Sequence, residues 1–402
     1  MYFGFILLAI VILLLMVLIH EFGHYTAAKI LGFTVDEFSV GFGPKIISRV
    51  MKNGERFSLR MLPLGGYCAF YGDEDVDDAP VALPEAEQTA SSDNSETPKK
   101  EEDLLSYVMR SKIDEQKSAP AEEATPVRLD KNGAAAKTFY QQPPWKRIIV
   151  LLGGVTFNFL SAIIFALIYI WAVGCPAPRV SDVYLDSANN AYNALKKGDV
   201  ILAVDGHDIT VMSSYNDLIE GVKEGQTVKF TVDRGGKIIS VDVVRQKITT
   251  VDKDGKASEY VGFGFVSETV FIGATAGHAF TYCVPYTFKL SWSILGSFGQ
   301  LITGSVPITS VTGPVGSVKL MADVTRADWR NILILLPLLA SNLAMFNILP
   351  FPALDGAQII FTVVEWIRKK PIKRKIQGII NAVGLIVLLL FVLIVDILSF
   401  AL

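Results

Sequence analysis

The sequence predicts a polytopic α-helical membrane protein with four transmembrane helices, a membrane-associated β-hairpin region and an external α+β domain. The 402 residues are 51% hydrophobic and only 19% charged, whereas soluble proteins carry about 25% charged residues. Four apolar runs approach the length of about 20 residues that crosses a bilayer. They lie at residues 3–19, 148–173, 332–354 and 379–395.

The first apolar run could be read as a cleaved signal peptide. However, no basic residue precedes it, no small-residue cleavage site follows it, and a His-Glu pair extends it. We therefore expect residues 1–30 to remain as transmembrane helix 1. The later runs predict transmembrane helices 2, 3 and 4 at residues 146–174, 331–356 and 378–402.

Lysine and arginine residues flank these runs, and such residues favour the cytosolic side of a membrane. Six follow the first run, two precede the second run, and six lie in a basic segment at residues 357–377. Both loops are therefore expected in the cytosol, with both termini outside. These positive charges sit beside apolar runs and form no broad basic stripe, so we expect the lipid bilayer, and no nucleic acid, as a partner.

The loop between the first two runs divides into two parts. Residues 33–72 contain the turn pairs Asn53-Gly54 and Gly65-Gly66, which predict β-hairpins. Apolar strands beside a membrane helix must hide their edges against protein, so we expect a membrane-reentrant β region. Residues 73–140 form an acidic insertion, with 17 acidic and 6 basic residues up to residue 130. This composition predicts a largely disordered cytosolic segment, apart from a short helix at residues 102–110.

Outside the membrane, residues 178–248 have the pattern of a compact mixed domain with a helix at 214–222. Its strands are expected at residues 180–184, 200–204, 228–232 and 238–244. Residues 260–330 are expected to form an extracytoplasmic juxtamembrane segment. Its aromatic but interrupted stretch at 280–301 predicts an amphipathic helix that lies on the membrane surface and does not cross it.

The sequence His20-Glu21-Phe22-Gly23-His24 ends the first apolar run. Residues four apart share a helix face, so His20 and His24 can reach one metal ion while Glu21 stays beside it. Zinc suits imidazole ligands and keeps a position open for water at catalytic sites. Glu21 would then accept a proton from that water and deliver it to a leaving amine. Such five-residue matches also occur by chance, but ionisable residues that prolong a membrane run are costly without a partner.

Asp355 is the candidate third ligand. It follows Pro350 and Pro352, which must break the third apolar run because proline cannot continue a regular helix. Irregular backbone at membrane depth is tolerated only where it is buried or faces a cavity. Taken alone, Asp355 fits equally well as an interfacial helix N-cap. The charge-derived topology favours a ligand, because it places the two histidines and Asp355 towards the cytosolic ends of their helices. The sequence therefore predicts one Zn²⁺ per chain.

These residues resemble a known family. The zinc motif at residues 20–24 and the segment 347–356 (Asn-Ile-Leu-Pro-Phe-Pro-Ala-Leu-Asp-Gly) look like the paired signature of the site-2 proteases, intramembrane zinc metalloproteases of peptidase family M50. The likeness covers nearly the whole chain and is greatest to the bacterial regulator-of-sigma-E type. It implies that His20, His24 and Asp355 bind zinc and that Glu21 is the catalytic acid and base. It also implies substrate-binding roles for Asn347, Asn158, Gly65 and Gly66.

The chain departs from the family pattern in the second helix, where Val155 stands in place of a frequent proline before Asn158. Residues 194–206, which contain Gly198-Asp199-Val200-Ile201, look like the turn and strand of a PDZ domain. Only one such stretch is present, as in the single-PDZ form typical of Gram-positive bacteria. A PDZ domain binds peptides at a sheet edge or acts as a bulky filter above an active site. We favour the filter, and both roles stay open.

By this resemblance, the expected activity is regulated intramembrane proteolysis in the bacterial cytoplasmic membrane. The substrates would be single-pass membrane proteins, such as anti-sigma factors or remnant signal peptides, already cut outside by an upstream site-1 protease. The PDZ domain would be extracytoplasmic and the active site would face the cytosolic side. Two other classes fit less well: a metal transporter would show a polar path and internal repeats, and an inactive PDZ scaffold would lack part of the zinc set.

Overall fold

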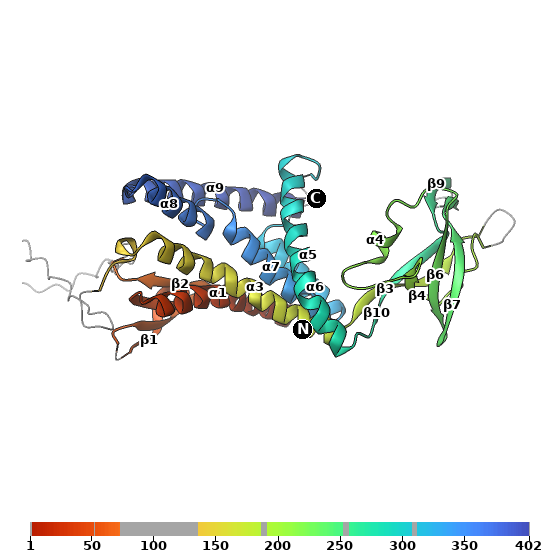
Figure 1. Ribbon diagram of the computed structural model, residues 1–402, viewed down its shortest axis with the longest axis horizontal. Helices are drawn as coiled ribbons and strands as arrows, with labels where there is room; N and C mark the ends of the chain where they lie inside the picture. Colours follow the sequence, from red (N-terminus) through yellow and green to blue (C-terminus); the bar gives the residue numbers. More distant parts are fainter. Residues whose placement is uncertain are drawn as a thin grey trace, which may run out of the picture.

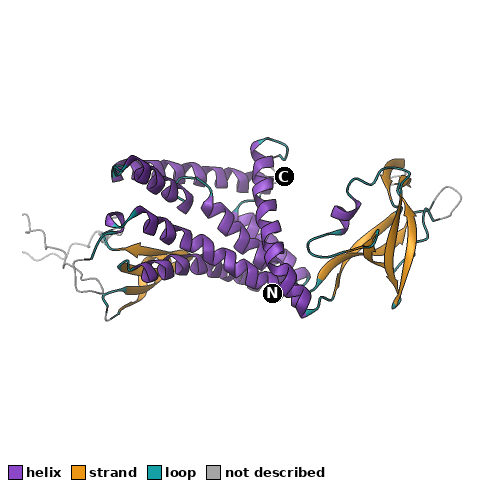
Figure 2. Cartoon of the chain, in the orientation of Figure 1, coloured by secondary structure: helices purple, strands orange, loops and turns teal. Residues whose placement is uncertain are grey.

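The computed structural model describes residues 2–51, 53–72, 136–185, 191–251, 257–307 and 312–401. The molecule is elongated, with a helical bundle at one end and a β-rich domain at the other (Figures 1 and 2). The expected helix at residues 102–110 and most of the acidic insertion lie outside the described residues.

Four helices in the described part of the chain are long and apolar enough to cross a membrane. They are α1 (Tyr2–Leu31), α3 (Pro144–Ala172), α7 (Asn331–Ile348) and α9 (Arg374–Ala401). Many of their large apolar side chains are exposed, as expected for helices that face lipid. The four apolar runs thus each contain a helix of membrane-spanning length, although the third helix, predicted at residues 331–356, ends at Ile348.

The four long helices follow the long axis of the bundle, and both termini lie at the end that faces the β-rich domain (Figure 1). The strands β1 and β2, the start of α3, and the junction of α8 with α9 lie at the opposite end. Helix α3 is central, because it packs against α1, α5, α7 and α8. The chain therefore alternates in direction through the bundle in the way that the flanking charges predict.

The region at residues 33–72 consists of two long antiparallel strands, β1 (Val35–Val50) and β2 (Arg56–Phe70). Each strand pairs twice with the other: residue Val40, for example, is opposite both Leu59 and Gly66. The result is a four-stranded sheet in the segment order 45–50, 56–60, 35–40, 66–70. Its segment 66–70 is therefore an edge of the sheet.

The β-rich domain has one sheet with the strand order β10-β3-β4-β6-β7, and β5 pairs with β4. The elements are β3 (Cys175–Val183), β4 (Val200–Val204), β5 (His207–Asp208), α4 (Tyr215–Ile219), β6 (Thr227–Arg234), β7 (Lys237–Val244), β8 (Gln246–Val251), β9 (Ala257–Gly262) and β10 (Phe265–Ile272). Strands β8 and β9 form a separate pair. The core centres on fully buried Phe230, Ile201 and Val232.

This sheet extends beyond the predicted boundary of 178–248. Strand β10 pairs with β3 along its length, although the sequence assigned residues 265–272 to the juxtamembrane segment. Without β10, strand β3 would expose an unpaired edge. Pairing with β10 satisfies this edge. The chain then returns to the bundle as α5 (Ala276–Ile302).

Three further helices in the described residues pack on the membrane-length helices. Helix α5 crosses the bundle at a steep angle to the four spans in Figure 1, and it packs on α3 and α7. It is not among the helices of membrane-spanning composition. Helices α6 (Pro314–Ala327) and α8 (Asp355–Arg368) flank α7, and a short 3-10 turn, η1 (Phe139–Gln141), precedes α3. The sequence analysis did not predict α8 as a helix.

Helices α1 and α3 meet at glycines. A Cβ atom on Gly23 would lie 2.3 Å from the carbonyl oxygen of Gly153, and a Cβ on Gly153 would lie 2.6 Å from the carbonyl oxygen of Gly23. Membrane helices approach closely only where such small residues line the contact. These two glycines therefore set the distance between α1 and α3.

We expect Gly23→Ala to destabilise the bundle, because its new methyl group overlaps the backbone of α3. Overpacking of this kind costs about 1–3 kcal/mol. Gly4→Ala is the matched control, since a Cβ there meets nothing within 4 Å on the same helix. Thermal unfolding in detergent should show a lower midpoint for Gly23→Ala alone. Equal midpoints for the two variants would contradict the close glycine contact.

The Gly198-Asp199 pair of the β-rich domain forms a buried polar anchor. Gly198 has a positive φ of 95°, and the Asp199 side chain is completely buried. Arg234 donates two hydrogen bonds to the Asp199 carboxylate, at 2.7 and 2.6 Å, and the backbone N–H of Lys196 donates a third at 2.8 Å. Burial acts to raise the pKa of Asp199, but these hydrogen bonds outweigh it and hold the pKa below its usual value.

The lowered pKa of Asp199 predicts that acid weakens this domain. The stabilisation is complete above the usual aspartate pKa of about 3.9, and it is lost as the pH falls through the lower native pKa. Asp199→Asn should therefore reduce the urea resistance of the domain at pH 7 and have a smaller effect near pH 3. Hydrogen–deuterium exchange of peptides from residues 200–234 reports this resistance. An equal effect of the substitution at both pH values would refute the prediction.

Candidate metal centre

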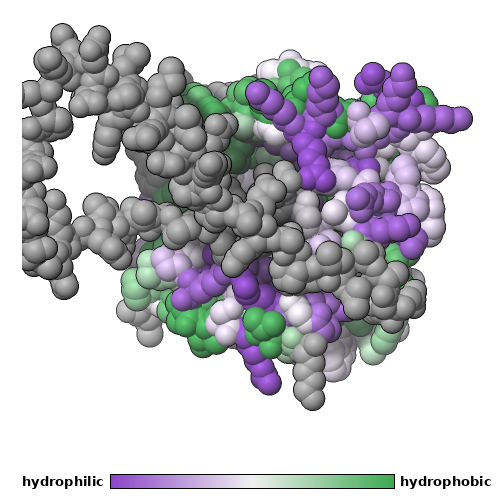
Figure 3. All heavy atoms as spheres, turned by 90° about the vertical axis from the view of Figure 1, so that its left-hand side faces the viewer, coloured by the Kyte–Doolittle hydropathy of each residue, from purple (hydrophilic) through white to green (hydrophobic). Residues whose placement is uncertain are grey.

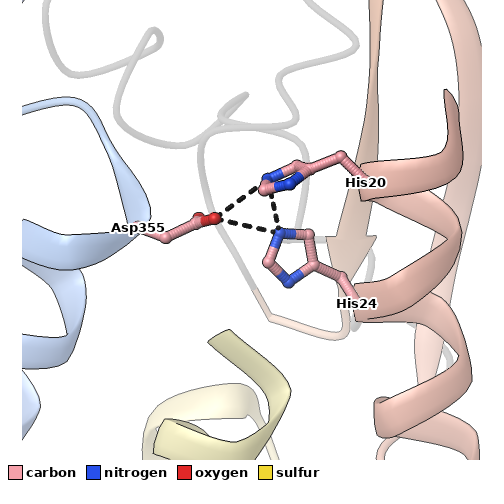
Figure 4. A group of neighbouring side chains, drawn as sticks. All are labelled: His20, His24 and Asp355. Carbon is pink, nitrogen blue, oxygen red and sulfur yellow. Dashed lines mark hydrogen bonds and ion pairs between the residues drawn. The ribbon is translucent and has the colours of Figure 1, made fainter. Parts of the chain in front are cut away.

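Two histidines on α1 and one aspartate on α8 converge inside the bundle (Figure 4). The Nε2 atoms of His20 and His24 lie 2.9 and 3.3 Å from Oδ2 of Asp355, and 3.1 Å from each other. Both histidines are buried. Among the described residues, these three form the one group of His, Cys, Asp and Glu side chains whose ligand atoms lie close enough to hold a metal ion.

The hydrogen bonding of His24 leaves a lone pair at the centre of this group. Its Nδ1 lies 2.9 Å from the carbonyl oxygen of Val150, which can only accept a hydrogen bond, so Nδ1 carries the proton. In the neutral imidazole, which is the form that binds a metal, Nε2 of His24 then presents its lone pair to the carboxylate of Asp355. Oδ2 of Asp355 is buried and has no hydrogen-bond partner. Electron-rich atoms can lie this close only with a proton or a metal cation between them.

The donor set fits zinc. Two imidazole nitrogens and one carboxylate oxygen are a known ligand combination of catalytic zinc, which keeps its fourth position for water. Ligand atoms about 2.0 Å from a tetrahedral zinc lie about 3.3 Å from one another. The separations of 2.9, 3.1 and 3.3 Å are close to this value. His20, His24 and Asp355 would hold the metal, in agreement with the residue types that the sequence singled out.

Asn158 of α3 contacts the outer nitrogen of His20. Its Nδ2 lies 3.1 Å from His20 Nδ1, while its buried Oδ1 has no hydrogen-bond partner. A 180° flip of the Asn158 amide exchanges Nδ2 and Oδ1. Oδ1 then accepts a hydrogen bond from Nδ1–H of His20. This arrangement satisfies Oδ1 and frees Nε2 of His20 for a metal. The observed contact of Asn158 is thus with a histidine, and its expected substrate-binding role stays a prediction.

Helix α3 also leaves the space in which the imidazoles sit. A Cβ atom on Gly154 would lie 2.5 Å from His24 Nε2 and 2.6 Å from His20 Cε1. Gly154 therefore admits both rings to the interior of the bundle. The sequence alone indicated neither this contact of Gly154 nor that of Val150. The spacing of residues 150, 154 and 158 on one helix face is the signal that could have found the group.

Glu21 of α1 lies beside the edge segment of β2. A Cβ atom on Gly66 would lie 3.6 Å from the Cγ atom of Glu21. The predicted acid and base is thus beside the sheet edge at residues 66–70. Gly65 has a positive φ of 138°, and a Cβ there would overlap the ring of Phe42. The substrate-binding roles of both glycines stay predictions.

A tight turn presents Asp355. Helix α7 ends at Ile348, and α8 begins at Asp355, so the prolines break the helix where the sequence predicted. Gly356 lets the two helices touch, because a Cβ there would lie 2.1 Å from the carbonyl oxygen of Leu349. Asn347 donates its recorded hydrogen bond to Leu343 within α7. Its contact with substrate stays a prediction.

Comparison with known proteins identifies the family of this chain. The model of the family described as Peptidase family M50 matches residues 8–391. The chain belongs to peptidase family M50. Relatives include proteins named as zinc metalloproteases in Agrobacterium fabrum (27% identical, covering 96% of this chain and 93% of the relative) and Streptococcus pyogenes (30% identical, covering 96% of each chain). The regulator of sigma-W protease RasP of Bacillus subtilis is 27% identical, with 94% of each chain covered.

Membership of the M50 family confirms the site-2 protease resemblance. The protein is a zinc metalloprotease, and its cofactor is Zn²⁺. The four apolar helices make it a multi-pass membrane protein. The family match covers both the α1 motif and the turn that carries Asp355, so it spans all the residues that converge in Figure 4.

We expect Gly154→Ala to weaken zinc binding, because its methyl group pushes both imidazoles from their present positions. Changes next to metal ligands cost about 10–100-fold in metal affinity. Gly378→Ala in α9 is a control, since a Cβ there meets nothing within 4 Å. Zinc per chain is measured by mass spectrometry after dialysis against a chelator. If Gly154→Ala retained as much zinc as the wild type, the proposed packing of the His20 and His24 rings against Gly154 would be contradicted.

Proposed function

We propose that this zinc metalloprotease hydrolyses peptide bonds within the transmembrane segments of single-pass membrane proteins. In this proposal His20, His24 and Asp355 are the zinc ligands, and Glu21 is the catalytic acid and base. The observation that carries the proposal is the convergence of the three ligand atoms between helices of membrane-spanning length. A site built there meets substrates that are themselves in the membrane.

The chemistry of the site follows from these roles. Bound zinc polarises the scissile carbonyl and makes the attacking water more acidic. The Glu21 carboxylate takes a proton from this water as its oxygen attacks the carbonyl carbon, and gives the proton to the amine nitrogen as the C–N bond breaks. Glu21 directly follows His20 on α1 and lies beside Gly66 of the sheet edge. A new carboxylate and a new amine are the products.

The sheet edge at residues 66–70 supports a way to hold an unwound substrate. A helical substrate has its carbonyls in hydrogen bonds, so it must become extended before water can attack. An extended peptide can add to a free sheet edge as a further strand. Gly66 has no side chain to block such an approach, and it lies beside Glu21. We infer that residues 33–72 are the membrane-reentrant element that presents the substrate.

The distribution of charge supports an orientation. Six basic residues lie between Arg368 and Lys375, at the junction of α8 and α9. This end faces the viewer in Figure 3, where hydrophilic side chains stand out above and below. The positive-inside rule then assigns this end to the cytosol of a bacterium. Both termini and the β-rich domain would be extracytoplasmic, with the active site towards the cytosolic side.

We further infer a role in regulated intramembrane proteolysis after a first, external cut. The relative from Bacillus subtilis is named as the regulator of sigma-W protease, which supports anti-sigma factors as substrates, alongside remnant signal peptides. An upstream site-1 protease would make the first cut. The β-rich domain, which we interpret as a single PDZ domain, would then act as a filter that excludes substrates with large external domains.

Substitution of Glu21 and Asp355 separates catalysis from metal binding. Glu21→Gln should lower cleavage of a single-pass model substrate by about 10²–10⁴-fold, because the proton acceptor is lost, while zinc is retained. Asp355→Asn should lose both cleavage and zinc. The measurements are product formation by purified protein in detergent or liposomes, and zinc per chain.

Glu268→Gln serves as the control, because this side chain is half exposed in the β-rich domain. It should leave both cleavage and zinc content unchanged. Cleavage at the wild-type rate by Glu21→Gln would contradict the role of Glu21 as catalytic acid and base. A wild-type zinc content in Asp355→Asn would reject Asp355 as a ligand.

A further inference from the structure

A buried ion pair joins α3 to α8 away from the metal centre. Nη1 of Arg147 lies 2.7 Å from Oε2 of Glu365, and the two side chains are only 5% and 7% exposed. The pair belongs to none of the sequence motifs that indicated the zinc site. A buried charge pair is not by itself stabilising, so its position in the fold is informative.

The surroundings of the pair fix both partners. The other carboxylate oxygen of Glu365 accepts hydrogen bonds from the Gln377 side chain at 2.9 Å and from the backbone N–H of Ile372 at 3.1 Å. The Arg147 guanidinium lies 5.4 Å from the ring centre of Phe139 and 5.0 Å from that of Tyr140. Glu365 therefore connects α3, α8 and the start of α9 in one polar network.

Arg147 also shares a helix face with the residues that arrange the metal centre. Positions 147, 150, 154 and 158 are separated by three, four and four residues, so they form one stripe along α3. Val150 and Asn158 contact the histidine rings, and Gly154 makes room for them. Arg147 ends this stripe and contacts α8 through Glu365.

Helix α8 packs along α3, and polar contacts join it to the bundle near both of its ends. Its first residue, Asp355, meets the histidines, and Glu365 meets Arg147 ten residues later. Ten helical residues span about 15 Å. Over this length a tilt of about 4° moves the far end by about 1 Å, and a shift of that size is enough to spoil a catalytic geometry.

We propose that Arg147 is a positioning residue for the zinc site: its pair with Glu365 fixes the tilt of α8, so that the Asp355 carboxylate is held against His20 and His24. This inference rests on the proposed function, because it takes Asp355 as a zinc ligand. Loss of one partner leaves a buried charge uncompensated, and α8 relieves it by moving its cytosolic end. Asp355 at the other end of the helix then moves as well.

The test uses Arg147→Lys and Glu365→Gln in the full-length protein. Lysine keeps the charge but loses the planar fork and the stacking on the aromatic rings. Glutamine keeps a side-chain oxygen for Gln377 and Ile372 and removes the charge. Both variants should release zinc into excess chelator about 10–100-fold faster than wild type. They should also show a lower kcat with little change in KM, because a metal ligand has moved and the substrate-binding surface has not.

The matched control is Arg179→Lys, since Arg179 pairs with Glu268 on the exposed surface of the β-rich domain at 45% and 51% exposure. It should release zinc at the wild-type rate. The charge-swapped double variant Arg147→Glu with Glu365→Arg should release zinc at least about fivefold more slowly than either swapped single variant, since it removes the uncompensated charge. Release of zinc within about twofold of wild type by both Arg147→Lys and Glu365→Gln, whatever their thermal stability, would overturn the proposal.

Asp355→Asn separates this proposal from the one on which it rests. If only the positioning role is wrong, Asp355→Asn releases zinc quickly while the Arg147 and Glu365 variants behave as wild type. If the proposed metal site is wrong, Asp355→Asn itself releases zinc at the wild-type rate.

Discussion

The structure depends on one electrostatic constraint: three electron-rich ligand atoms from opposite ends of the chain meet at membrane depth, within 3.3 Å of one another. In a low-dielectric interior such atoms repel unless a cation lies between them. Zn²⁺ meets this requirement, and it explains why charged side chains are found where a bilayer otherwise excludes them. The ion would thereby join the first and the last thirds of the sequence.

Helix α3 is the support on which this meeting depends. It orients the imidazoles through Val150 and Asn158, leaves them space at Gly154, and touches α1 through Gly153. Its first turn reaches α8 through Arg147. One face of a single helix thus contacts both elements that carry the proposed ligands, and the β1–β2 sheet covers the remaining side near Glu21.

Hydropathy predicted the four long helices, because lipid-facing helices are apolar on every side. Flanking charges predicted that His20 and Asp355 lie towards the same side of the membrane. The contacts of α3 with the histidines were not predicted. Val150 contributes a backbone carbonyl, and Gly154 contributes only the absence of a side chain. Neither feature can be recognised from the residue type. The pairing of β10 with β3 and the Arg147–Glu365 contact also escaped, since both join segments far apart in the sequence.

Diffraction at the zinc absorption edge tests the account most directly. Crystals of the full-length protein should give one anomalous peak per chain, about 2.0–2.2 Å from Nε2 of His20, Nε2 of His24 and a carboxylate oxygen of Asp355. A zinc peak bound by other residues, with the two histidines and Asp355 apart from it, would contradict the account.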